Sequence, residues 1–195
     1  KLVQWLWNRQ WGKEILFFFL GNKKDKRGWP DWVRKTDEER CQNLPQLLPG
    51  DETKWIVTEK IDGSSTTFTY KRKGKNKGFY VCSRNVCFDT PEKADKCFYD
   101  SNVYLEMAQK YNIEEVLKEI LNAFPEWDAI TLQGETYGEG VQKRTYGLKG
   151  HDFMAFNLIL ANDINDQERL SSVSMRAILD KHNIPCVPIL DTEFH

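Results

Sequence analysis

Two runs of strand-forming residues, Ser65–Arg72 and Phe79–Arg84, constrain the fold most. They flank the turn Lys73-Gly74-Lys75-Asn76-Lys77-Gly78. Two such runs on either side of a short glycine-containing turn predict a β-hairpin, and a hairpin makes its strands antiparallel. The hairpin therefore predicts that an antiparallel sheet forms part of the fold.

The rest of the chain alternates further strands with helices. Residues 100–124 are predicted to be helical, because one apolar face repeats with a period of 3.6 residues before Pro125 ends it. Ser171 or Ser172 is expected to cap another helix that runs to about His182. Strands are expected at residues 54–59, 129–137 and 152–160, with a last one beginning at 185–189. This pattern predicts an α+β fold of antiparallel sheets with helices on the outside.

Length and charge limit the interpretation only loosely. The 195 residues can bury one substantial core, or form a domain plus an extension, and the net charge of −1 gives no global sign of nucleic-acid binding. The one dense basic cluster lies on the predicted hairpin: Lys71, Arg72, Lys73, Lys75 and Lys77. Such a cluster is either a solvated turn or a contact for a phosphate backbone.

Residues 1–50 are interpreted as a helical extension or linker ahead of a domain at 51–195. An amphipathic helix is expected within residues 1–20, and its charged and amide side chains exclude a membrane span. Thr36 and Glu39 form a capping box that predicts a short helix from about Asp37 to Leu44. The five cysteines include no Cys-x-x-Cys pair, so we expect reduced thiols in an intracellular protein and no zinc site.

The candidate for chemistry is Lys60, in the segment Glu59-Lys60-Ile61-Asp62-Gly63 between two predicted strands. A lysine at a strand end suits attack on a nucleotide phosphate once neighbouring groups lower its pKa from about 10.4. Asp62 could help to hold a divalent cation there, and Gly63 would let the backbone turn closely around a ligand. Lys-x-Asp-Gly also occurs in ordinary surface turns, so the tetrapeptide alone does not decide between the two interpretations.

Four segments in order resemble the motifs of the ATP-dependent RNA ligases, within the superfamily of covalent nucleotidyltransferases. The segment around Lys60 resembles the first motif. Ser83-Arg84-Asn85, Gly134-Glu135 and Phe153-Met154-Ala155-Phe156-Asn157 resemble those that follow. Gly138-x-Gly-Val-Gln142-Lys143 resembles RNA ligases of the second phage type rather than DNA ligases or capping enzymes. Residues 35–43 resemble a branch with an additional N-terminal OB domain.

The resemblance implies a nucleotidyltransferase domain, of the DNA-ligase-like or ATP-grasp kind, with the nucleotide in a cleft between sheets. Its implied activity is the sealing of RNA 3′-hydroxyl and 5′-phosphate ends through AMP linked to Lys60, with ATP and Mg²⁺ or Mn²⁺. The catalytic residues would be Lys60, Asp62 and Glu135, and the two carboxylates would hold the metal through water. The nucleotide would be bound by Glu59, Arg84, Gln142, Lys143 and Phe156, with Phe156 stacked on adenine.

The chain departs from the pattern because the superfamily's last two motifs, an acidic-Gly strand and a Lys-x-Lys strand, do not appear. We therefore expect a fragment lacking C-terminal strands, partly or wholly inactive alone, whose partners are RNA ends and a missing OB domain or C-terminal segment. Its last strand, expected at 186–190, would then have an unpaired neighbour. The alternatives are a nucleotide- or RNA-binding module without catalysis, and a DNA ligase or capping-type transferase.

Overall fold

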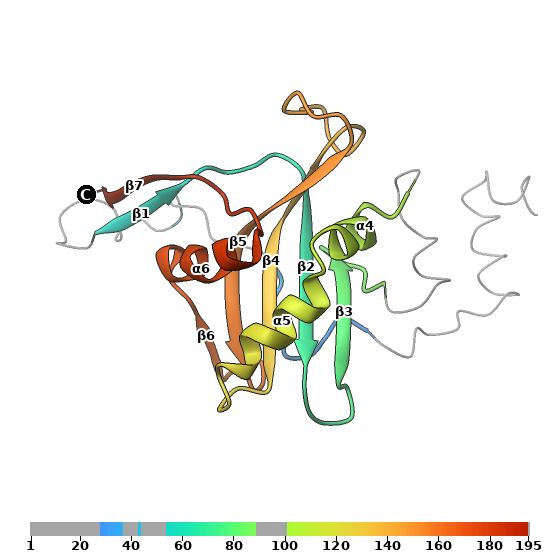
Figure 1. Cartoon of the computed structure of the whole chain (residues 1–195), viewed down its shortest axis with the longest axis vertical. Helices are drawn as coiled ribbons and strands as arrows, with labels where there is room; N and C mark the ends of the chain where they lie inside the picture. The colour runs from blue at the N-terminus through green and yellow to red at the C-terminus, as the bar shows by residue number, and fades with distance from the viewer. Residues whose placement is uncertain (1–27, 37–42, 44–53, 89–100, 195) are drawn as a thin grey trace, which may run out of the picture.

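The structure is a computed structural model that describes residues 28–36, 43, 54–88 and 101–194 (Figure 1). Its main feature is a five-stranded antiparallel sheet in the order β3-β2-β4-β5-β6, and a second sheet pairs β1 with β7. The prediction of antiparallel sheets with helices outside is confirmed.

The predicted hairpin is formed by β2 and β3, which stay in register from Thr66 opposite Ser83 to Lys71 opposite Gly78. The strand ahead of it is β1, and the two central strands predicted after it are β4 and β5. A short strand, β6, was not predicted. The bounds are β1 Trp55–Thr58, β2 Ser64–Lys71, β3 Gly78–Ser83, β4 Ala129–Gly138, β5 His151–Ala161, β6 Gln167–Arg169 and β7 Ile189–Phe194.

Residues 100–124 form two helices rather than one, α4 (Val103–Lys110) and α5 (Ile113–Asn122). The break is at Asn112, whose φ of 48° is left-handed and cannot continue an α-helix. The predicted apolar face of α5 is buried against β2 and β4, in a core that includes Phe68, Ile130 and Leu132. α6 (Ser172–Leu179) is capped by Ser171 and runs into the 3₁₀ turn η3 (Asp180–His182), as predicted. All three helices lie on one face of the large sheet (Figure 1).

Residues 29–36, here called the strap, cover part of the opposite face. Trp32 is 1% exposed and packs with Tyr80, Cys82, Ala129 and Ala161 from three strands of the sheet. Its indole Nε1 donates to Thr69 Oγ1 at 3.0 Å, and its carbonyl accepts from Gln167 Nε2 at 2.6 Å. The strap therefore packs as part of the sheet's core, while the division of the chain at residue 50 stays a prediction.

The last strand starts later than predicted, and it pairs with β1 in the smaller sheet. β7 begins at Ile189 and pairs with β1, whereas residues 185–187 make only an isolated parallel bridge to β5 around Ala155. The cause lies in Pro185 and Pro188, which have no backbone N–H to donate to a regular ladder. After Pro188 the chain turns to the smaller sheet, where the Pro188 carbonyl accepts from the Glu59 N–H at 2.9 Å.

Several expectations fall partly outside the described residues. The helix within residues 1–20 lies wholly outside them, and the capping-box helix lies almost wholly outside. Thr36 itself places its hydroxyl 2.8 Å from that of Ser65. The described helices are all too short and too polar to cross a membrane. Cys82, Cys87 and Cys186 are buried.

Candidate functional site

Lys60 lies in the connection between β1 and β2, which runs from Glu59 to Gly63. Ile61 anchors this turn, since it is 5% exposed and packs with Tyr137 of β4 and Val187. Lys60 and Asp62, on either side of it, are exposed. The buried Ile61 side chain thus holds the turn against the sheet, while the Lys60 ammonium and the Asp62 carboxylate on either side stay accessible to solvent.

Gly63 is required by the closeness of β4. A Cβ at this position would lie 2.4 Å from the Thr136 carbonyl oxygen and 2.9 Å from Glu135 Cγ. No side chain can be accommodated there without moving the backbone. The glycine of the Lys-x-Asp-Gly segment therefore lets the Lys60 turn lie directly on the strand that carries Glu135.

Glu135 is half-buried on the face of β4 that points away from the helices, the face it shares with Tyr137. Burial raises the pKa of its carboxyl group to about 7, and the negative charge of Asp62 adds to the increase. The positive charge of Lys60 and a hydrogen bond from the Gly63 backbone act in the opposite direction on this pKa. Lys60, Asp62 and Glu135 are thus close enough to influence one another.

The donor set fits a hard divalent cation. Asp62 and Glu135 supply carboxylate oxygens, which Mg²⁺ and Mn²⁺ prefer, and Mg²⁺ commonly binds proteins through one or two carboxylates while keeping several waters. Within the described residues there is no cluster of three or more His, Cys, Asp or Glu side chains suited to a metal. Two carboxylates with water completing the shell therefore match what these residues offer.

Phe156 occupies a β-bulge. Gln133 of β4 pairs with Asn157, and the next residue, Gly134, pairs with Ala155, so Phe156 is an extra residue on β5. A bulge re-aims the side chain that it carries. Phe156 is only partly buried and packs against the cluster of Ile61, Tyr137 and Val187, beside the Lys60 turn. Sequence analysis predicted the residue but not the bulge.

Arg84 and Glu59 lie at the same end of the large sheet as Lys60. Arg84 is exposed in the turn that follows β3, directly after Ser83, which pairs with Thr66 near the start of β2. Glu59 precedes Lys60 and is exposed, with its backbone N–H bonded to Pro188. The two residues predicted to bind the nucleotide thus lie at the end of the sheet where the Lys60 turn begins.

Gln142 and Lys143 are in the loop between β4 and β5, residues 139–150, which projects beyond the sheet (Figure 1). Gln142 Nε2 donates to the Gly63 carbonyl at 3.3 Å, whereas Lys143 is exposed. The same loop brings in a residue that sequence analysis missed: the Tyr146 hydroxyl accepts from the Asp62 backbone N–H at 2.8 Å. No sequence pattern pointed to Tyr146, because it lies in an exposed loop that has neither a helical nor a strand repeat of apolar residues.

The basic cluster on the hairpin does not form one open surface. Arg72 is half-buried and donates to the Leu121 and Phe124 carbonyls at 2.6 and 2.7 Å, at the C-terminal end of α5. Lys73 pairs with Asp128 at 3.0 Å, and the Lys71 ammonium lies 4.5 Å from the centre of a Trp32 ring. Two exposed lysines, Lys75 and Lys77, remain for the phosphate-contact interpretation.

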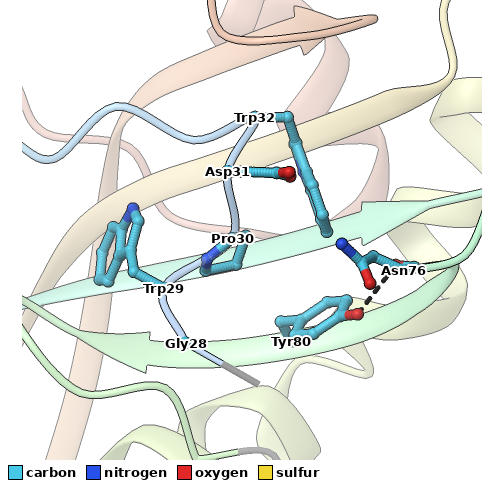
Figure 2. A pocket seen from close by; sticks show the side chains of 7 residues that line it. All are labelled: Gly28, Trp29, Pro30, Asp31, Trp32, Asn76 and Tyr80. Atoms are coloured by element: carbon cyan, nitrogen blue, oxygen red, sulfur yellow. Dashed lines mark hydrogen bonds between the residues drawn. The ribbon is translucent and has the colours of Figure 1, made fainter. Parts of the chain in front are cut away.

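Two small pockets lie elsewhere, along the strap. One, of about 150 Å³, is where residues 28–32 cross the hairpin, lined by Trp29, Trp32 and Tyr80 among others (Figure 2). The other, of about 170 Å³, is lined by Arg34, Lys35, Gln133, Ile159, Asn165, Gln167 and Arg169. Neither contains Lys60 or a carboxylate next to a nucleophile, so we place the chemistry at the Lys60 turn and not in these hollows.

Comparison with known proteins identifies the family. A family profile described as RNA ligase matches residues 53–195. No curated protein sequence matches the chain. Solved structures of an RNA ligase from Naegleria gruberi do: a variant with ATP and Mn aligns with a TM-score of 0.65 at 30% identity, covering 86% of this chain and 46% of that one.

Two further structures of the Naegleria enzyme give the same result. The enzyme with pyrophosphate aligns with a TM-score of 0.65, and a variant with AMP and Mn with one of 0.64, both at 30% identity. In both comparisons the alignment covers 86% of this chain and 46% of the other. The chain thus spans less than half the length of the ligase it matches.

Proposed function

Because the chain belongs to the RNA ligase family, we propose that it is the nucleotidyltransferase domain of an ATP-dependent RNA ligase, with Lys60 as the nucleophile. The observation that carries the proposal is the close approach of the turn bearing Lys60 and Asp62 to the strand bearing Glu135, where a Cβ at Gly63 would lie 2.9 Å from Glu135 Cγ. A lysine beside two carboxylates, on a turn with accessible side chains, suits attack on a phosphate bound with a cation. The Naegleria structures with ATP, AMP and pyrophosphate support the same chemistry.

In the proposed reaction the neutral amine of Lys60 attacks the α-phosphorus of ATP. A P–N bond forms, the P–O bond to pyrophosphate breaks, and the proton lost by the amine passes to solvent or to a nearby base. The product is AMP joined to Lys60 as a phosphoramidate.

The other residues are proposed to bind the nucleotide. The Arg84 guanidinium is a planar donor suited to a phosphate. Phe156, directed by its bulge toward the Lys60 turn, offers a ring on which adenine stacks. Glu59 borders the base, while Gln142 and Lys143 contact the nucleotide or the RNA end.

Asp62 and Glu135 would hold Mg²⁺ or Mn²⁺, mostly through water. Such an ion supplies charge neutralisation at the phosphates and lowers the pKa of a nearby lysine. The two side chains, together with the Gly63 amide that donates to Glu135, then orient the turn toward the α-phosphate.

The substrate is proposed to be RNA with a 3′-hydroxyl and a 5′-phosphate, joined after AMP passes from Lys60 to the 5′-phosphate. Since the matched ligase is more than twice as long as the matched region, an OB domain or a C-terminal segment is the proposed partner. Trp55, Ile56 and Leu190 of the smaller sheet are 39%, 38% and 64% exposed, and such a segment would cover them. The five cysteines, odd in number and without a Cys-x-x-Cys pair, favour an intracellular enzyme.

The test is labelling with α-³²P-ATP and Mn²⁺, followed by a denaturing gel. We expect a labelled band with the unaltered chain and none with Lys60→Ala or Lys60→Arg, because arginine stays protonated and cannot attack. Lys77→Ala, in the distant hairpin turn, is the matched control and should label normally. All three variants should unfold at the temperature of the parent, since both lysines are exposed.

Labelling that persists in Lys60→Ala would exclude Lys60 as the nucleophile. A chain that binds ATP or RNA but never becomes labelled, even with a C-terminal segment from a related ligase added in trans, would be the non-catalytic binding module instead.

A further inference from the structure

We propose that Tyr146 is a positioning residue that fixes the Lys60–Gly63 turn through a hydrogen bond to its backbone. This inference rests on the proposed function for its kinetic part and on geometry alone for its structural part. Tyr146 lies 84 residues after Asp62 in sequence, yet its hydroxyl accepts the Asp62 backbone N–H at 2.8 Å. It touches the backbone of the turn, so its effect on chemistry would be indirect.

The loop that carries Tyr146 is closed firmly at its base. Gly138 pairs with His151 across β4 and β5, and the Glu139 N–H donates to the Gly150 carbonyl at 3.0 Å. The His151 ring links two further elements, with Nδ1 2.9 Å from Glu106 Oε2 of α4 and Nε2 2.9 Å from the Glu139 carbonyl. The loop is therefore an extension of the sheet with a defined direction.

Tyr146 itself has an unfavourable backbone conformation. Its φ is 52° and that of Gly147 is 72°, and the Leu148 N–H donates to the Thr145 carbonyl at 3.0 Å. Positive φ at both central positions of a turn suits glycine or asparagine and costs energy at a tyrosine. Such strain persists only where surrounding contacts compensate for it.

Two contacts supply that compensation, and both lead to the site. The Tyr146 ring packs edge-on against Tyr137, with 5.2 Å between ring centres, and Tyr137 contacts Ile61 in the buried cluster. The Tyr146 hydroxyl oxygen accepts a hydrogen bond from the Asp62 backbone N–H. Tyr146 thus contacts Tyr137, which packs with the anchor residue Ile61, and its hydroxyl binds the backbone of the turn.

Gln142 of the same loop completes the arrangement by donating from Nε2 to the Gly63 carbonyl at 3.3 Å. The loop therefore binds the backbone N–H of Asp62 and the backbone carbonyl of the next residue, Gly63. The side chains of Lys60 and Asp62 are left for substrate. When the Asp62 N–H and the Gly63 carbonyl are both hydrogen-bonded, the turn has fewer conformations and its nucleophile fewer orientations. A positioning residue raises the rate of a chemical step in this way.

The experiment compares Tyr146→Phe with the parent chain. This variant keeps the ring contact with Tyr137 and removes only the acceptor of the Asp62 N–H. By NMR hydrogen exchange we expect the Asp62 amide to exchange about tenfold faster, as the loss of one hydrogen bond implies. Tyr70→Phe is the matched control: it removes a tyrosine hydroxyl on the helix-covered face of β2 and should change neither the exchange nor the labelling.

The kinetic readout is single-turnover formation of lysyl-AMP. We expect the maximal rate in Tyr146→Phe to fall about 10- to 100-fold, with the ATP concentration for half-maximal rate changed less than about twofold. A rise in that concentration with an unchanged maximal rate would mean that Tyr146 binds ATP, and would overturn the positioning role. The positioning role would also be overturned if the Asp62 amide exchanged at the parent's rate, or if it exchanged faster while the rate of lysyl-AMP formation stayed the same.

Failure of the proposed function looks different. If the parent chain forms no lysyl-AMP, the ligase assignment fails while amide exchange still reports whether Tyr146 holds the turn. In that case an Asp62 amide that exchanges at the parent's rate in Tyr146→Phe overturns the inference. An Asp62 amide that exchanges faster than in the parent supports the structural part of the inference.

Discussion

Gly63 lies so close to Thr136 that a Cβ added to it would be 2.4 Å from the Thr136 carbonyl oxygen. We predict that Gly63→Ala displaces the Lys60 turn from β4 and destabilises the fold by about 1–3 kcal/mol, the usual cost of overpacking. The loss of lysyl-AMP formation should exceed tenfold, because Lys60 and Asp62 move with the turn. Urea unfolding and single-turnover labelling measure the two effects.

Gly28→Ala provides the control, since a Cβ at Gly28 has no neighbour within 4 Å among the described atoms. Its stability and labelling should equal those of the parent. If Gly63→Ala also behaved like the parent, the close approach of the turn to β4 would not matter for the reaction.

The second prediction concerns the metal. Asp62→Asn and Glu135→Gln each remove one charge from the proposed water-mediated site, so both should require more Mg²⁺ or Mn²⁺ for half-maximal labelling. Titrating the metal at fixed ATP measures this shift, with Glu126→Gln, an exposed residue far along the chain, as control. Full activity of both variants at limiting metal would refute the assignment.

The third prediction is a pH dependence of stability from Glu135. Burial raises its pKa from 4.5 to about 7 in the folded protein, so the folded state keeps a proton that the unfolded state loses. The resulting stabilisation is complete below pH 4.5 and is lost as the pH rises to about 7. For a half-buried group we expect a change of about 1–2 kcal/mol between pH 5 and pH 8.

Glu135→Gln stays neutral and should abolish that part of the dependence. Urea unfolding of parent and variant, in buffer without divalent metal or nucleotide, gives the difference between the two stability profiles. Parallel profiles from pH 5 to pH 8 would show that the carboxyl titrates normally.

Phe156 gives the fourth prediction. If its ring stacks on adenine, Phe156→Leu should weaken ATP binding by about 0.5–1.5 kcal/mol, the usual worth of an aromatic pair, while a leucine still fills the apolar space. Phe156→Tyr should bind ATP normally. Equal weakening of unfolding free energy and ATP affinity in Phe156→Leu would instead identify the residue as ordinary core.

The fifth prediction tests whether the strap belongs to the folding unit. Trp32→Ala leaves a cavity against Tyr80 and Ala129 and removes one hydrogen-bond donor to Thr69 Oγ1, so we expect a loss of about 3–5 kcal/mol. Val173→Ala, at a half-exposed position on α6, should cost little. A small effect at Trp32 would support an independent domain that starts near residue 51.

The sequence pattern predicted those elements of the fold that depend on residues close together in the chain. The hairpin, the capped helix after Ser171 and the apolar face of α5 all follow from local periodicity and turn chemistry. The break at Asn112 did not, because the apolar residues continue on both sides and only the backbone angle ends the helix. β6 is too short to give a pattern.

The site divides in the same way. Lys60, Asp62 and Gly63 were predicted from residue type and order, and Glu135 from the resemblance of Gly134-Glu135 to a ligase motif; the structure brings them together. The bulge at Phe156 and the contact between Tyr146 and Asp62 depend on pairing between distant strands. A single sequence carries no information on such pairing, so geometry alone reveals them.

The hydrogen bond from Glu59 to Pro188 has a mechanical consequence. It attaches the residue before the nucleophile to the start of β7, and β7 pairs with β1, which leads directly into Lys60. In the described part of the chain, the smaller sheet has only these two strands, so the outer edge of β7 is open to another strand. A strand that paired with this edge would be connected through β7 and β1 to Lys60, the proposed nucleophile, so its docking should change the position of that residue.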